Sequence, residues 1–391
     1  MKMLKTLALA AASLGALAAP AFAEDTVKIG LIMPFTGPFA SEGKQIGAAV
    51  KLYMQRNGNT VAGKKIEVIE KDDAGTADTT KRLAEELVVN DKVSFLVGFG
   101  LTPLALATAP VATKAKVPMI VMAAATSAIT EASPFVFRTS ETMAQSCAPL
   151  GDWASQNGIK KVVTVVSDYA PGHDAEKSFS ERIVAAGGTV ENVRVPLRNP
   201  DFSPYLQKVA DAKPDAVFVF VPSGIGAQFM KQFRERGLDK LGIKLIGPGD
   251  VIDDDLLEGI GDVALGAITS HYYSAAHDSP ENKAYVEAFK KANNGMRPNF
   301  MSVGGYDGMN LIYEALKKSG GDTDGEKLAA AMKGLAWTSP RGPISVDPET
   351  RDIIQNIYIR EVKKKDGELY AIEFHTIPNV KDPTKEAKKK G

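Results

Sequence analysis

The chain has 391 residues, of which 44% are hydrophobic and 24% charged, and its 47 basic and 47 acidic side chains cancel. At about 150 residues per domain, this length predicts two or three domains. The composition excludes a disordered protein and a multi-span membrane protein. The lack of a basic excess argues against a nucleic-acid partner. The single cysteine, Cys147, excludes an intramolecular disulfide and a cysteine-based zinc site.

Residues 1–23 have the pattern of a secretory signal peptide. Lys2 and Lys5 precede an apolar stretch at 7–17, and an A-x-A cleavage site follows at 21–23. The apolar stretch is too short for a membrane anchor, so we expect export and cleavage after Ala23. No later run reaches 18 apolar residues, and we therefore expect no membrane insertion of the mature chain.

The first half of the mature chain alternates strand and helix patterns. Strands are expected at 27–33, 65–70, 93–97 and 119–122. Helices are expected at 41–57 and 79–90, and further helical segments open at 102 and 126. Such alternation predicts a parallel sheet with helices on both faces.

The same alternation restarts after residue 160. Strands are expected at 161–166, 189–195, 215–221, 243–246, 265–270, 354–360 and 369–374. Helices are expected at 174–186, 205–212, 226–237, 280–293 and 301–318. Two α/β units without a flexible linker predict a two-lobed, hinged protein. We expect the lysine-rich tail at 379–391 to be solvated and frayed.

Two segments between a strand and a helix could bind an anion. Gly98-Phe99-Gly100-Leu101-Thr102-Pro103 places Thr102 as a helix N-cap and Pro103 at the first helical position. Ala123-Ala124-Ala125-Thr126-Ser127 adds small side chains and two hydroxyls. Backbone N–H groups, hydroxyls and helix dipoles at such turns favour a carboxylate. Two ordinary capped helices would give the same pattern, and the residues alone leave both interpretations open.

Catalytic and cofactor motifs are poorly represented. The four histidines fit no metalloprotease, nucleophile-elbow or phosphate-loop spacing. Gly259–Ala264 matches a dinucleotide-binding pattern but follows a helical segment, and Asp253-Asp254-Asp255 suits a helix start better than a calcium loop. His271 could line a pocket or lie at a crossover between lobes. We therefore expect no enzyme activity, cofactor or metal.

Several motifs, in this order and spacing, resemble one family. They are V-K-I-G-L-I-M-P-F-T-G-P at 27–38, E-V-I-E-K-D-D at 67–73, V-G-F-G-L-T-P at 97–103, A-A-A-T-S at 123–127, F-R-T at 137–139, V-V-S-D-Y-A-P-G at 165–172, R-N-P-D-F at 198–202 and R-P-N-F at 297–300. Together they resemble the periplasmic solute-binding proteins of ABC importers, specifically the type I fold of the leucine/isoleucine/valine-binding protein. The resemblance spans essentially the whole mature chain.

The resemblance implies an α/β fold of two doubly wound parallel-sheet lobes, joined by three crossovers, with a ligand cleft between them. The amino-terminal lobe would comprise 24–142 and 273–350, and the carboxyl-terminal lobe 143–272 and 351–378. It also implies a monomer in the periplasm that closes on one small ligand and docks on a membrane permease.

The resemblance also assigns site residues. Thr102 and Thr126 would hold the α-carboxylate of the ligand, Thr126 through both its hydroxyl and its backbone N–H. Ala124 would offer its carbonyl to an ammonium. Tyr169 would close over the ligand from the other lobe, and Ser223, just after a buried strand, would be a further contact.

Two departures from the family bear on the ligand. Gly249 aligns with the glutamate that meets the ammonium in amino-acid-binding members, and Asp250 is its neighbour. Glu42 stands where an aromatic residue often lines the side-chain pocket, so Phe39 and Phe300 are expected to supply the apolar wall.

The sequence therefore predicts a binding protein for a small carboxylate, with a branched-chain or other apolar amino acid as the expected ligand. If Asp250 points away from the pocket, an aromatic carboxylic acid becomes the alternative. A ligand-binding sensor for a receptor kinase would have the same fold. A secreted enzyme would need a base and a nucleophile facing each other, and the histidines offer no such pair.

Overall fold

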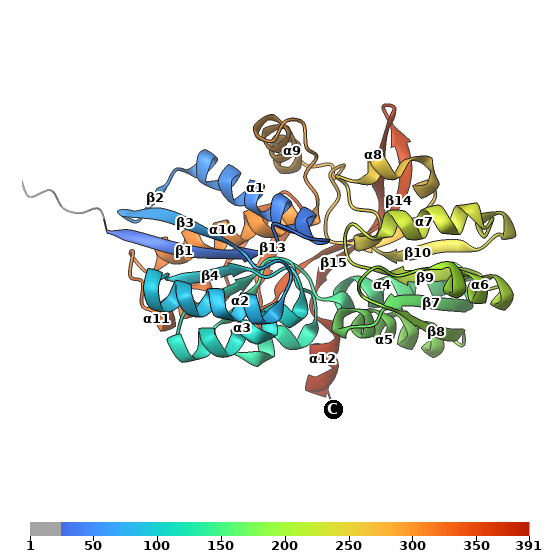
Figure 1. Ribbon diagram of the computed structural model, residues 1–391, viewed down its shortest axis with the longest axis horizontal. Helices are drawn as coiled ribbons and strands as arrows, with labels where there is room; N and C mark the ends of the chain where they lie inside the picture. Colours follow the sequence, from blue (N-terminus) through green and yellow to red (C-terminus); the bar gives the residue numbers. More distant parts are fainter. Residues whose placement is uncertain (1–24, 391) are drawn as a thin grey trace, which may run out of the picture.

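A computed structural model describes residues 25–390 as two α/β lobes that lie side by side (Figure 1). One sheet has six strands in the order β2-β3-β1-β4-β5-β6. The other has nine, in the order β12-β13-β14-β11-β10-β9-β7-β8, with β15 paired to β14. The predicted signal peptide and its cleavage site lie outside the described residues. Within 25–390, no helix combines the length and apolar character needed to cross a membrane.

The first lobe is built on a largely parallel sheet with a continuous hydrophobic core. Its strands are β1 (Thr26–Met33), β2 (Thr60–Val61), β3 (Lys64–Asp72), β4 (Phe95–Gly98), β5 (Met119–Val121) and β6 (Val136–Arg138). Its helices are α1 (Ala40–Asn57), α2 (Ala77–Glu86), η1 (Leu87–Asp91), α3 (Thr102–Ala115) and η2 (Ser127–Ala132), and the same core includes residues of α9 (Pro280–Ala292), α10 (Phe300–Lys318) and α11 (Gly325–Met332).

The second lobe repeats this arrangement, with buried residues on both faces of its sheet. Residues 216–220, A-V-F-V-F, are apolar throughout because helices cover both sides of the strand. Its strands are β7 (Lys161–Ser167), β8 (Thr189–Val195), β9 (Ala216–Phe220), β10 (Lys244–Pro248) and β11 (Ile268–His271). Its helices are α4 (Met143–Gln156), α5 (Ala170–Ala185), α6 (Ser203–Ala212), α7 (Gly226–Glu235), η3 (Asp239–Leu241), η4 (Gly249–Val251), α8 (Leu257–Ile260) and η5 (Gly261–Ala264).

The last strands connect the two lobes. A hairpin of β12 (Ala336–Ser339) and β13 (Gly342–Val346) pairs with the start of the long strand β14 (Ile353–Lys365), which then pairs along β15 (Glu368–Val380). Ile353 and Ile357 belong to the core of the first lobe, whereas Val362 belongs to a core of the second. Strand β14 thus crosses from the first lobe to the second. The expected two-lobed α/β fold of the type I binding proteins is confirmed.

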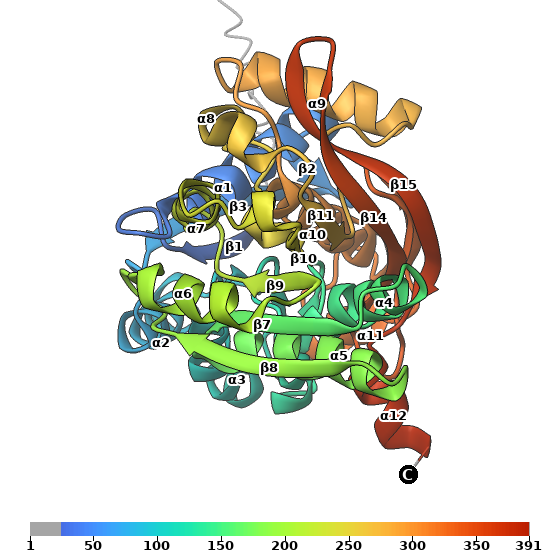
Figure 2. The same cartoon turned by 90° about the vertical axis from the view of Figure 1, so that its right-hand side faces the viewer.

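The carboxyl-terminal tail differs from the prediction. Residues 383–390 form helix α12 at the end of the chain (Figure 2) instead of a frayed end. This helix contacts α4. Lys385 is buried, and its Nζ donates to Thr130 and to Asp352. The frayed end was predicted from the basic composition of the tail, which does not show that Lys385 pairs with the buried Asp352 carboxylate. A buried carboxylate needs a cation near it.

Candidate ligand-binding site

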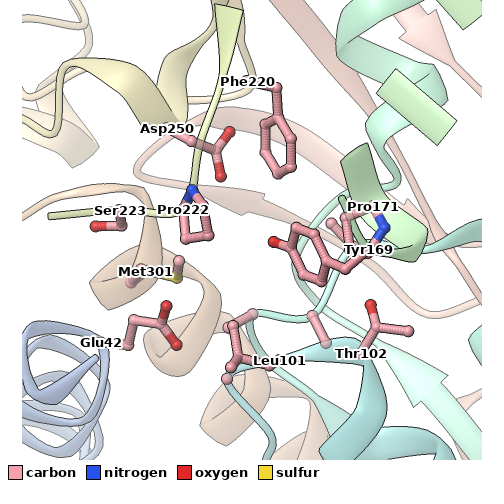
Figure 3. A pocket seen from close by; sticks show the side chains of 14 residues that line it. Glu42, Leu101, Thr102, Tyr169, Pro171, Phe220, Pro222, Ser223, Asp250 and Met301 are labelled. Atoms are coloured by element: carbon pink, nitrogen blue, oxygen red, sulfur yellow. The ribbon is translucent and has the colours of Figure 1, made fainter. Parts of the chain in front are cut away.

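A small pocket lies between the lobes, at the carboxyl ends of strands from both sheets (Figure 3). Ligands of α/β proteins commonly bind at this edge. The first lobe contributes Glu42, Gly100, Leu101, Thr102, Met301 and residues 123–125. The second lobe contributes Tyr169, Pro171, Phe220, Pro222, Ser223 and Asp250.

One end of the pocket is formed by the start of helix α3, whose dipole favours a negative charge. Pro103 has no N–H, and the N–H groups of Leu104 and Ala105 donate to the Leu101 carbonyl, so the dipole and the Thr102 hydroxyl are what this end offers an anion. Thr102 was expected to cap this helix, but the N-cap is Leu101, and the Thr102 hydroxyl instead bonds that of Thr126 at 2.9 Å. A single proton bridges the two oxygens, so the other hydroxyl proton remains for a ligand. Thr126 is buried behind Thr102 and supports it without lining the pocket.

Arg138 holds the turn at 123–127 in place, a role that the sequence analysis missed. Its guanidinium is fully buried and donates to the carbonyls of Ala124 at 2.6 Å, Thr126 at 2.6 Å and Glu141 at 3.0 Å. Its Nε pairs with Asp352 at 2.9 Å. The Ala124 carbonyl, expected to face an ammonium, is therefore engaged by Arg138, although Ala124 does line the pocket.

The opposite part of the pocket carries acidic and hydroxyl groups. Glu42 projects from α1 and Asp250 from η4, and both side chains are directed toward the pocket (Figure 3). Burial, together with the Asp250 and Asp73 carboxylates, raises the pKa of Glu42 well above its ordinary value. Ser223 lines the same region, and its buried hydroxyl has no hydrogen-bond partner among residues 25–390.

The apolar wall comes from other residues than expected. The ring of Tyr169 stacks on that of Phe220, with centroids 6.1 Å apart and planes 11° from parallel, and its hydroxyl points into the pocket (Figure 3). Met301 lines the side of the first lobe. Phe39 instead packs on Leu101 and Leu104 beside the pocket. Phe300 packs on the ring of His271, so neither phenylalanine lines the pocket.

Gly249 packs directly against the side chains of Arg360 and His271. A Cβ atom at this position would be 2.1 Å from Nη2 of Arg360 and 2.6 Å from the His271 ring. Any side chain there would displace both neighbours, so only glycine fits this arrangement. Arg360 comes from β14 and is itself fully buried, with Nη1 bonded to the Tyr273 carbonyl.

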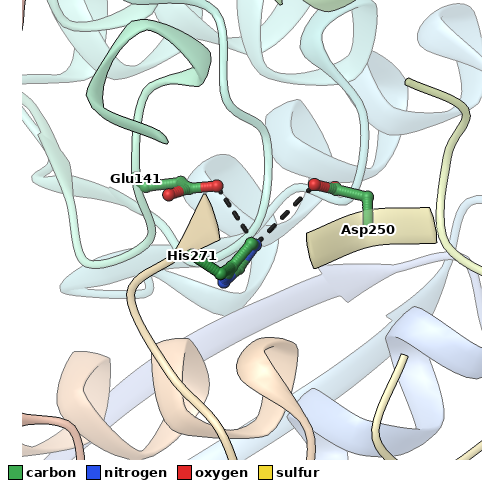
Figure 4. A group of neighbouring side chains, drawn as sticks. All are labelled: Glu141, Asp250 and His271. Atoms are coloured by element: carbon green, nitrogen blue, oxygen red, sulfur yellow. Dashed lines mark ion pairs between the residues drawn. The ribbon is translucent and has the colours of Figure 1, made fainter. Parts of the chain in front are cut away.

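His271 joins two buried carboxylates behind the pocket (Figure 4). Its Nε2 lies 3.1 Å from Oε1 of Glu141 and 3.7 Å from Oδ2 of Asp250. Burial alone would lower the pKa of His271, but the Glu141 and Asp250 carboxylates outweigh it and hold that pKa above its ordinary value. The three ligand atoms lie within 4.8 Å of one another, close enough to share a cation. When the imidazole carries a proton, the same three groups form an ion-paired cluster.

The two lobes also touch outside the pocket. Arg198 of the second lobe donates to the Gly75 carbonyl at 2.9 Å and lies over the Phe39 ring at 5.4 Å. The Ser127 N–H donates to Asp174 at 3.0 Å. Because each of these contacts joins one lobe to the other, the arrangement is a closed one, and opening the cleft would break them.

Comparison with known proteins matches residues 26–368 to the periplasmic binding protein family. A Leu/Ile/Val-binding protein homolog 6 of Brucella melitensis is 46% identical over 386 residues, covering 97% of this chain and 99% of that protein. A solute-binding protein of an ABC transporter from Rhodopseudomonas palustris BisB5, solved with 3,4-dihydroxybenzoic acid, is 66% identical, with a TM-score of 0.91 and coverage of 93% and 100%. One from strain HaA2, solved with p-hydroxybenzoic acid, is 42% identical, with a TM-score of 0.89 and coverage of 92% and 99%.

Proposed function

Because this chain belongs to the family of type I periplasmic binding proteins that serve ABC importers, we propose that it binds an aromatic carboxylic acid in the periplasm and delivers it to a membrane permease. Members of this family bind solutes and do not transform them. The ligand carboxylate would lie at the start of α3, near the Thr102 hydroxyl, and the ring would pack against Tyr169, Phe220 and Met301.

The observation that carries the choice of ligand is the space around Gly249. A glutamate at this position would collide with Arg360 and His271, so the carboxylate that meets an ammonium in amino-acid-binding members has no room here. The Ala124 carbonyl is likewise engaged by Arg138. The structural neighbours solved with hydroxylated benzoic acids support the same ligand class.

A branched-chain amino acid is the second candidate. The Asp250 carboxylate lines the pocket, and an ammonium bound there would have a negative charge beside it. The name of the Brucella relative is consistent with this ligand. The two candidates differ in one chemical group, because only the amino acid carries a positive charge.

A thermal unfolding screen of the purified exported protein tests the proposal. A ligand at 100 times its dissociation constant should add about 2.7 kcal/mol to the free energy of unfolding. We expect 3,4-dihydroxybenzoate and 4-hydroxybenzoate to raise the melting temperature, and leucine to leave it unchanged. A shift with leucine alone would reject the aromatic ligand and leave the transport role in place.

A variant separates the two candidates further. Asp250→Asn removes the charge that an ammonium needs but keeps a hydrogen-bonding side chain. It should abolish any binding of leucine, whereas an aromatic carboxylate should lose far less affinity. Glu85→Gln, at an exposed position of α2, is the matched control for the loss of one negative charge.

A further inference from the structure

The pocket presents two carboxyl groups from opposite lobes. Glu42 lies on α1 of the first lobe and Asp250 on η4 of the second, and both line the same space (Figure 3). Figure 3 shows both side chains away from that of Thr102, at the start of α3. A ligand whose carboxylate binds at that end would therefore direct its far side toward the two carboxyl groups.

Both carboxyl groups lack part of their hydrogen bonding. Oε2 of Glu42 and Oδ2 of Asp250 are buried, and neither has a hydrogen-bond partner within residues 25–390. Oδ2 of Asp250 lies 3.7 Å from Nε2 of His271, beyond normal hydrogen-bond distance, and faces the cluster behind the pocket. A buried polar atom without a partner is unfavourable, so Oε2 of Glu42 is set to receive a polar group from a ligand.

A glycine makes room for the Glu42 side chain. A Cβ atom at Gly100 would lie 2.3 Å from Oε2 of Glu42, so any other residue in this loop would displace the carboxyl group. The loop follows β4 and also leads into Thr102, which means that one turn shapes both ends of the pocket.

The charge state of Glu42 follows from its neighbours. The titratable groups that face it from other elements are Asp250 and Asp253 near η4, Asp73 after β3, and Tyr169 before α5. Burial and the nearby carboxylates raise the pKa of Glu42 well above its ordinary value, and no cation counters them. A neutral carboxyl group can donate one hydrogen bond and accept another.

We propose that Glu42 selects ligands bearing a ring hydroxyl, through a hydrogen bond between its carboxyl group and that hydroxyl. This inference rests on the proposed function, since it assigns the far side of an aromatic acid. A phenol oxygen can accept a hydrogen bond from a neutral carboxyl group, whereas an ammonium would need an acceptor at this place.

The proposal predicts discrimination against unsubstituted benzoate. Benzoate would leave Oε2 of Glu42 buried without a partner, and sites built to bind a hydroxyl reject analogues that lack it. We therefore expect 4-hydroxybenzoate to bind at least tenfold more tightly than benzoate.

Isothermal titration with benzoate, 4-hydroxybenzoate and leucine tests the role of Glu42. Two variants of nearly the same size are compared with the unmodified protein. Glu42→Gln keeps a donor and an acceptor and should retain the preference for 4-hydroxybenzoate. Glu42→Met removes both and should bring the two benzoates to within about threefold of each other, mainly by improving benzoate. Glu85→Gln, remote from the pocket, should leave every affinity unchanged.

The outcomes separate this inference from the proposed function. Binding of leucine with no binding of either benzoate would reject the aromatic ligand itself. Binding of both benzoates with the preference intact in Glu42→Met would reject the role of Glu42 and leave the aromatic ligand standing. Loss of the preference in Glu42→Gln would also overturn the inference, because it would show an ionised acceptor instead of a neutral donor.

A pH series on the unmodified protein gives an independent measure if Glu42→Met does not fold. The preference for 4-hydroxybenzoate should hold while Glu42 is neutral and decline as the pH rises through its elevated pKa. A preference that increases over that range would contradict the proposal.

Discussion

Replacing Arg138 with methionine should damage both the stability of the protein and its binding site. The guanidinium donates to three buried carbonyl groups and pairs with Asp352, all at distances of 2.6 to 3.0 Å. Arg138→Met keeps most of the side-chain volume and removes every one of these bonds. The Ala124 and Thr126 carbonyls, which belong to the turn beside the pocket, lose their charged donor.

The expected loss of stability follows from the burial of these groups. Breaking a buried ion pair typically destabilises by about 3–5 kcal/mol, because one charge remains without its partner. Asp352 keeps Lys385 as a second cation, which limits that part of the loss. The carbonyl groups add about 1–3 kcal/mol for each one that water cannot reach. We expect a total loss of at least about 3–5 kcal/mol, which is a large share of the roughly 5–15 kcal/mol that stabilises most proteins.

Urea unfolding and titration with 3,4-dihydroxybenzoate measure the two effects. Lys385→Met is the control, because it removes the other cation of Asp352 and leaves the bonds to the turn intact. Both variants should unfold at lower urea, but only Arg138→Met should weaken ligand binding, by tenfold or more. A loss of stability below about 1 kcal/mol would refute the energetic reasoning. Equal affinity in the two variants would refute the positioning role of Arg138.

Three further predictions concern the pocket and its closure. Thr102→Ala and Thr126→Ala should each weaken carboxylate binding by about 1–3 kcal/mol in titration calorimetry. The double variant should lose less than the sum of the two, because the two hydroxyls share a hydrogen bond. Unchanged affinity in both single variants would exclude this anion site. The unligated protein should lose stability as the pH rises from 4.5 through the raised pKa of Glu42, since the folded state keeps a proton that the unfolded chain has lost. Urea midpoints across the pH range should therefore show a flatter profile for Glu42→Gln, and parallel profiles would contradict the assignment. Arg198→Ala removes contacts between the lobes, so the ligand-induced contraction seen by small-angle scattering should need a higher ligand concentration. Contraction at the same ligand concentration as in the unmodified protein would show that these contacts do not stabilise closure.

The parts of the site that sequence could predict are those fixed by local backbone pattern. Thr102 and Thr126 each follow a strand and precede a helix, and neighbouring parallel strands bring such turns together, as the bond between their hydroxyls shows. The direction of a side chain within a helix is harder to predict. Phe39 and Phe300 lie near the pocket, yet Met301, one residue further along α10, is the one that lines it.

The sequence pattern could not predict the contacts of long polar side chains that come from distant strands. Arg138 appeared only as part of a short motif, and nothing in that motif shows that its guanidinium turns back to the carbonyls of residues 124 and 126. Arg360 lies in a strand read from its apolar character, and it reaches Gly249 only because β14 pairs beside β11. A charged residue within an otherwise buried strand is the available signal, because such a residue needs a partner.

The same two carboxyl groups connect ligand recognition with closure. In the closed arrangement Glu42 and Asp250 come from different lobes to line one small space, where burial and the Asp250 carboxylate raise the pKa of Glu42. Closure without a ligand therefore buries Oε2 of Glu42 with no partner, which favours the open form. A hydroxylated ring supplies a partner for this oxygen only when the lobes are together, so the contact belongs to the closed state. Ligands with this chemistry should thus shift the equilibrium toward closure, while benzoate, which binds only at the start of α3, should close the lobes less completely at saturation.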